Sequence, residues 1–122
     1  MPRIDMISEK TQISEDRHDE FDAIVNTLHG VRGPFSILMH SPGLAQKVME
    51  AGAQVRLNST LSPVEREIAI IAVAREKDAT YEWAAHVKTG RTAGMAEEVI
   101  DVIRYGLDSR ELDEIEQGII EF

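Results

Sequence analysis

The sequence contains no cysteine among its 122 residues, which excludes disulfide bonds, thiolate nucleophiles and sulfur-ligated zinc. Aromatic residues make up only 5% of the chain. The longest apolar run extends from Ile68 to Ala74 and is too short to cross a bilayer. The polar first ten residues lack the apolar core of a signal peptide. These absences predict a soluble, cytoplasmic protein with no membrane partner.

Positive charge is also scarce, because 22 acidic side chains face 13 basic ones and the net charge is −9. Nucleic acids and anionic membranes both require concentrated positive charge, so neither is expected as a partner. A small anionic substrate stays compatible with this balance, since a local site can oppose the overall charge. The length and the 43% content of hydrophobic residues predict one compact domain over residues 1–122.

The pattern of breaks and apolar spacing predicts an all-helical chain of about six helices. No segment shows the sustained period-two alternation of a strand. Three of the four prolines are placed where the first turn of a helix tolerates them. Residues 1–13 are expected to form an extended arm. The predicted helical segments are residues 15–28 with Ser14 as the cap, a short turn at 35–39, then 42–57, 63–77, 81–93, 96–105, and a final helix opening at 108.

Two capping boxes are predicted near helix starts. Ser62 with Glu65 is the clearest start signal in the chain, and a second box pairs Asp108 with Glu111. The final helix is still amphipathic at Phe122, without a glycine or basic turn to end it. Three interpretations stay open: another chain covers the apolar face, the sequence continues further, or the helix frays at its end.

Glu67 is the carboxylate of the helix after Ser62 that points toward its apolar side. At 3.6 residues per turn it lies close to Ile70, Ile71 and Ala74. A buried carboxylate is costly without a partner. The side chain is therefore expected either to tie down a neighbouring loop or helix, or to take part in a site.

The next helix carries Glu82 and His86 four residues apart on one face, which Gly90 continues. This face is compatible with the border of a pocket, or with a tight helix–helix contact in which the pair is a rim salt bridge. The second histidine of a metalloprotease motif is missing, and no phosphate loop or dinucleotide fingerprint occurs. We therefore expect neither a metal nor another cofactor.

Several separated motifs resemble the carboxymuconolactone decarboxylase family, which shares a fold with the alkylhydroperoxidase AhpD proteins. The motifs are L-S-P-V-E-R-E-I (61–68), Y-E-W-A-A-H-V (81–87) and A-G-M (93–95), with R-G-P-F (32–35) and H-S-P (40–42) upstream. The resemblance implies an all-α, AhpD-like helical bundle. It also implies a homo-oligomer, either a dimer, a trimer or a hexamer, that completes the bundle.

AhpD-type peroxidases combine a glutamate, a C-x-x-C pair and a histidine. Matching their histidine to His86 matches their glutamate to Glu67, whereas the two cysteines fall on Ala79 and Glu82. Thiol-dependent peroxide reduction requires a thiolate. The resemblance therefore covers the acid and the imidazole, and the missing sulfurs exclude peroxidase activity.

The decarboxylase branch also lacks the cysteine pair, and its reaction removes CO₂ from a small carboxylated lactone. The resemblance implies that protonated His86 stabilises the developing oxyanion or returns a proton to carbon. Glu67 and Glu82 are expected to orient the imidazole and to favour its cationic form. Tyr81 and Trp83, beside them, are the predicted substrate contacts.

Two other functions remain open from the sequence. The same residues suit another proton-transfer enzyme, such as an isomerase or a lactone hydrolase, and they also suit a non-catalytic scaffold or partner subunit. Glu67, Glu82 and His86 are called the Glu–His set below. A pocket with apolar walls beside this set favours an enzyme or a ligand-binding protein. Basic residues considered for capture of an anionic substrate are Arg32, Arg56 and Arg66.

Overall fold

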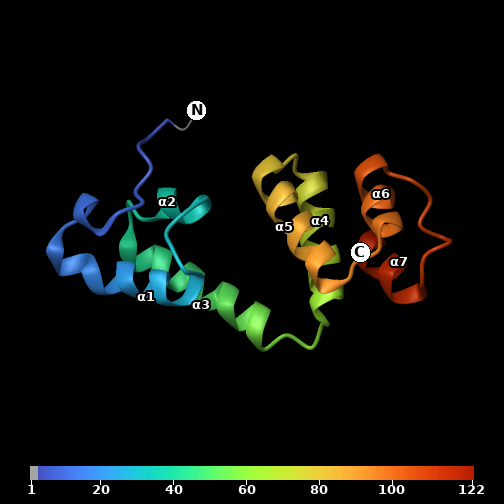
Figure 1. Cartoon of the computed structure of the whole chain (residues 1–122), viewed down its shortest axis with the longest axis horizontal. Coiled ribbons are helices and arrows are strands. Elements are labelled where there is room, and N and C mark those ends of the chain that lie inside the picture. Colours follow the sequence, from blue (N-terminus) through green and yellow to red (C-terminus); the bar gives the residue numbers. More distant parts are fainter. Residues whose placement is uncertain (1–2) are drawn as a thin grey trace. The chain divides into compact units, whose positions relative to one another are not determined.

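The computed structural model describes residues 3–122 and confirms the all-helical prediction (Figure 1). No strand occurs among those residues. The contacts of the chain fall into two compact units, one ending at Ser59 and the other beginning at Thr60, and each is described by itself. Within residues 3–122, every helix is too short or too polar to span a lipid bilayer.

Seven α-helices and two single turns of 3₁₀ helix follow one another in the described part of the chain. They are η1 (Lys10–Gln12), η2 (Glu15–Arg17), α1 (His18–Leu28), α2 (Pro34–Leu38), α3 (Pro42–Leu57), α4 (Pro63–Glu76), α5 (Thr80–Ala93), α6 (Glu97–Tyr105) and α7 (Glu114–Glu121).

The first unit packs α1 and α2 against α3. Its core combines residues of these helices and of the segments beside them: Ile7, Phe21, Ile24, Val31, Met39, Ala45 and Met49. The predicted cap at Ser14 has the right position, but its side chain makes no capping hydrogen bond, and the helix begins as a 3₁₀ turn.

The arm predicted to be extended over residues 1–13 contains a 3₁₀ turn at Lys10–Gln12, whereas residues 1 and 2 lie outside the described residues. The side-chain oxygen of Gln12 accepts hydrogen bonds from the backbone N–H groups of Ser8 and Glu9, both at 2.8 Å, and these bonds cap the start of the 3₁₀ turn. Ile7 is 6% exposed, and its N–H donates to the carbonyl of Ser36 at 2.9 Å. The arm is therefore anchored to the first unit.

The second unit is built around α4, which contacts α5, α6 and α7 (Figure 1). Because one side of α4 is apolar, it can bury Ile68 and Ile71 completely. α6 contributes the other large share of the core, including Val99 and Ile100. This packing fixes α4 and α5 side by side, and that pair carries the predicted site residues.

The start of α4 confirms the predicted capping box. Ser62 Oγ accepts a hydrogen bond from the N–H of Glu65 at 3.2 Å, and Glu65 Oε2 accepts from the N–H of Ser62 at 2.7 Å. Pro63 occupies the first turn, where no N–H is needed.

Replacing Ser62 by alanine is expected to lower the free energy of unfolding by about 0.5–2 kcal/mol, because the Glu65 N–H loses its acceptor. Urea denaturation followed by circular dichroism measures this change. Ser14→Ala is the matched control, since the side chain of Ser14 makes no capping hydrogen bond. Equal losses in the two variants would contradict a capping role for Ser62.

The predicted start of the final helix at Asp108 is wrong. Arg110 holds the Asp108 carboxylate with its guanidinium and its backbone N–H, and this hydrogen bonding lowers the pKa of Asp108 from its usual value. The carboxylate is therefore engaged in a turn. α7 begins at Glu114, and its capping box pairs Asp113 with Glu116.

Candidate functional site

α4 and α5 bring together the three predicted catalytic side chains. Nδ1 of His86 lies 2.7 Å from Oε2 of Glu67, and Nε2 of His86 lies 3.3 Å from Oε2 of Glu82. The first contact joins the two helices, and the second lies within α5, where a spacing of four residues places both side chains on one face. One imidazole is therefore held between two carboxylates.

The two carboxylates have different environments. The Glu67 side chain is only 5% exposed, whereas that of Glu82 is 38% exposed. Both oxygens of the Glu67 carboxylate have a polar neighbour, because Oε1 lies 3.9 Å from Nε of Arg66 while Oε2 contacts the imidazole. This pairing satisfies the requirement that a buried carboxylate has partners.

The contact geometry assigns the ring nitrogens of His86. A hydrogen bond of 2.7 Å to a buried carboxylate makes Nδ1 the donor to Glu67, so Nε2 faces the more exposed Glu82. The two carboxylates contact opposite ring nitrogens and do not converge on one point. In the described part of the chain, no group of three or more histidine, aspartate or glutamate side chains is placed to hold a metal ion.

Gly90 permits the close approach of the helices beneath this pair. A Cβ atom added there would lie 2.6 Å from Cε of Met95 and 3.5 Å from Cβ of Glu67. Gly90 and Met95 are both buried. A side chain at position 90 would therefore press on the end of the Met95 side chain.

Replacing Gly90 by valine is expected to lower the free energy of unfolding by about 1–3 kcal/mol, because overpacking displaces Met95. Thermal melting measures the loss. Gly52→Val on α3 is the matched control, since a Cβ at Gly52 meets nothing within 4 Å. A Gly90→Val variant as stable as the Gly52→Val variant would show that the contact is not tight.

A small apolar hollow of about 410 Å³ lies along α4 and the start of α5. Its walls are mostly aliphatic, and Glu82 is one of its two charged lining residues. Glu67 and His86 do not line it. The hollow therefore reaches the Glu–His set at Glu82, the carboxylate that contacts Nε2 of His86.

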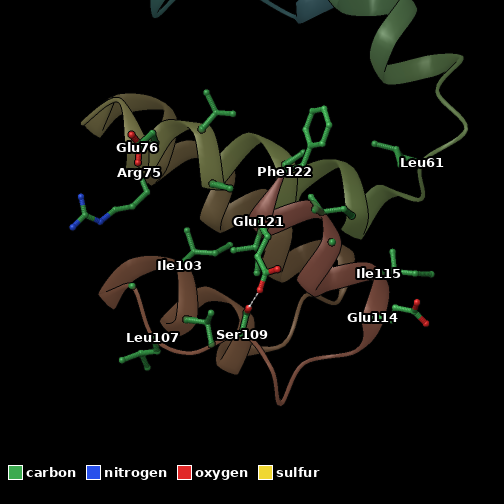
Figure 2. Close-up of a pocket in the computed structure, with 18 of the residues that line it drawn as sticks. Leu61, Arg75, Glu76, Ile103, Leu107, Ser109, Glu114, Ile115, Glu121 and Phe122 are labelled. Atoms are coloured by element: carbon green, nitrogen blue, oxygen red, sulfur yellow. Dashed lines mark hydrogen bonds between the residues drawn. The ribbon is translucent and has the colours of Figure 1, made fainter.

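A second hollow, of about 980 Å³, lies between α4, α6 and α7 (Figure 2). Ile103, Leu107, Ile115 and Phe122 contribute apolar surface to it, and a hydrogen bond of 2.5 Å joins Ser109 to Glu121 at its side. This hydrogen bond is the main cause that lowers the pKa of Glu121. The hollow does not include Glu67, Glu82 or His86.

The model of the carboxymuconolactone decarboxylase family matches residues 42–114, which is more than half of the chain. The chain belongs to this family. No curated protein and no solved structure matches the sequence significantly. The AhpD-like helical fold predicted from the motifs is thereby confirmed. α4 and α5, which carry the Glu–His set, both lie inside the region that matches the family.

The two predicted substrate contacts, Tyr81 and Trp83, have different environments. The Tyr81 residue is 56% exposed. Trp83 is partly buried against the core of the second unit, with the Arg104 guanidinium 5.8 Å from the centre of its ring. Neither aromatic residue lines the two hollows described above.

Of the three arginines considered for anion capture, Arg66 lies beside Glu67, whereas Arg32 and Arg56 belong to the first unit. Lys77, which lines both hollows, was not among the site residues predicted from the sequence. The signal in the sequence that could have indicated it is the interval of four residues from Ala69 to Val73 and from Val73 to Lys77, which places the three on one face at the end of α4.

Proposed function

We propose that the protein is an acid–base enzyme that removes CO₂ from a small carboxylated lactone, with His86 as the proton donor. The observation that carries the proposal is the imidazole held at 2.7 Å by the buried carboxylate of Glu67. Membership of the carboxymuconolactone decarboxylase family supports the same reaction class.

The two glutamates have separate parts in this proposal. Glu67 is a positioning residue, because it acts through the imidazole: it accepts the Nδ1 hydrogen and thereby fixes the orientation and tautomer of the ring. Glu82 contacts Nε2 and also lines the smaller hollow, and its side chain is partly exposed to solvent. His86 Nε2 is then the nitrogen that exchanges protons.

The proposed step balances without a cofactor. The C–C bond to the leaving carboxylate breaks, CO₂ departs, and the bonding electrons delocalise into the lactone carbonyl. Protonated His86 transfers the Nε2 proton to a carbon of the resulting enolate. The neutral imidazole then regains a proton from water, with the partly exposed Glu82 as the relay.

A decarboxylation assay tests the proposal. Purified protein is mixed with γ-carboxymuconolactone, and loss of substrate absorbance is followed together with release of CO₂. We expect turnover that needs His86. If the folded protein leaves the substrate intact after prolonged incubation, this reaction is rejected and the scaffold interpretation is favoured.

We also propose that the protein self-associates through the exposed apolar surface around the larger hollow. Leu107, Ile115 and Phe122 are all more than half exposed there, and an exposed apolar patch of this kind is typical of an interface. Sedimentation velocity is expected to give an oligomer that Ile115→Glu weakens. A wild-type monomer at about 100 µM, well above the Kd of a typical specific complex, would contradict this proposal.

A further inference from the structure

We propose that Lys77 is the anion anchor of the smaller hollow, and that this hollow takes a small carboxylic acid with an apolar cyclic body. The use of that ligand as a substrate rests on the proposed function. The binding itself rests on the lining of the hollow and on the state of the lysine, and it can be tested without turnover.

The lining of the hollow has a simple chemical composition. Two of its seven residues are charged, Lys77 and Glu82, and the other five are aliphatic: Ala69, Ile70, Val73, Ala74 and Ala79. Such walls favour a hydrophobic ring or chain, whereas the few polar groups set its orientation. The hollow therefore fits a ligand that is apolar over most of its surface and charged at one end.

The Lys77 ammonium is available for a ligand. Among residues 3–122 it takes part in no hydrogen bond or ion pair. The nearby Asp78 carboxylate is paired instead with the Arg75 guanidinium, at 3.4 Å. An ammonium group beside apolar walls gains a charge-assisted hydrogen bond when a carboxylate binds it.

The second charged residue fixes the direction of the ligand. Glu82 repels a carboxylate, so the acid end of the ligand is directed to Lys77. The opposite end then lies at Glu82, whose Oε2 is 3.3 Å from Nε2 of His86. This polarity places the anchored carboxylate at Lys77 and the apolar body at the end of the hollow where Glu82 contacts the imidazole.

The two hollows adjoin along one face of α4. Ala69, Val73 and Lys77 follow one another at intervals of four residues, and all three line both hollows. Lys77 is thus at the junction. A ligand body larger than the smaller hollow can extend over Ala69 and Val73 while its carboxylate stays at the same ammonium group.

An NMR titration tests this inference with benzoate, an apolar ring with one carboxylate, and with benzyl alcohol as its neutral analogue. The full-length ¹⁵N-labelled protein is expected to show shifts at Ile70, Ala79 and Glu82 with benzoate, and weaker binding of the alcohol. Lys77→Ala is expected to raise the Kd for benzoate roughly fivefold, as for a solvent-exposed ion pair, and Lys77→Glu to abolish binding.

Lys88→Ala on α5 is the matched control, because Lys88 is also exposed but lines neither hollow. It should leave the Kd unchanged. The inference is overturned if benzoate produces no shifts at the hollow, if the alcohol binds equally well, or if Lys77→Glu binds like the wild type. If the wild-type protein binds benzoate but does not turn over γ-carboxymuconolactone, the decarboxylase proposal alone is rejected.

Discussion

Replacing His86 by alanine is expected to lower the turnover of γ-carboxymuconolactone by about 10²–10⁴-fold, the range that a positioned general acid contributes. The physical reason is that Glu67 occupies Nδ1 of His86, so that the proton is exchanged at the other ring nitrogen, Nε2. Steady-state kinetics under substrate saturation measures the effect, and it should fall on kcat rather than on KM.

His29→Asn provides the control for the His86 variant. His29 is exposed and adopts a left-handed conformation with φ of 59°, which asparagine tolerates. Turnover of this variant should match that of the wild type. If His86→Ala retains turnover while its circular dichroism spectrum is unchanged, then His86 is not the acid, and the Glu–His pair only joins α4 to α5.

Replacing Glu67 by glutamine is expected to lower kcat by about 10²–10⁴-fold while the fold is kept. Glutamine fills the same space, but its amide can donate to Nδ1 and thereby select the wrong tautomer, an effect of about 10⁴-fold when the orienting carboxylate of a catalytic histidine is replaced by an amide. The buried position of Glu67 prevents water from substituting for the lost carboxylate. Steady-state kinetics and circular dichroism together measure the two parts of this prediction.

Glu76→Gln is the matched control on the same helix. Glu76 is exposed, lies outside the Glu–His set, and loses one negative charge in the same way. Its turnover should stay close to that of the wild type. Equal losses in the Glu67 and Glu76 variants would show that total charge matters and that the contact with His86 does not.

The helices and the positions of the Glu–His set could be predicted from the sequence because they depend on residues within a few positions of one another, through helix capping and helical periodicity. The box at Ser62 depends on residues three positions apart, and the inward direction of Glu67 follows from helical periodicity alone. The spacing of Glu82 and His86 within one helix likewise predicted their contact. The contact of His86 with Glu67 needed more, and the family motifs indicated it by naming both positions.

The predictions that failed depend on contacts between distant or competing groups. Asp108 has the spacing of a capping residue, but Arg110 binds its carboxylate, and α7 starts later, at Glu114, with Asp113 as its cap. The arm was expected to be extended, yet a 3₁₀ turn forms at Lys10–Gln12, the side chain of Ile7 is buried in the core of the first unit, and its N–H donates to the carbonyl of Ser36. Neither competition is visible from periodicity.

The hollows were beyond prediction for a related reason. Lys77 lines both of them because α5 and α7 pack on different sides of α4, and the sequence does not state how helices surround each other. A single lysine after an apolar stripe is usually a solvated end of a helix. Only the packed helices distinguish this one.

The most direct test of the central claim is an NMR assay with γ-carboxymuconolactone ¹³C-labelled at the leaving carboxylate, in D₂O. The proposal predicts that the label appears as CO₂ and bicarbonate, that the product carries one deuterium at a carbon of the former enolate, and that His86→Ala stops both changes. An opened lactone that retains its label, or unchanged substrate with folded wild-type protein, would contradict the account.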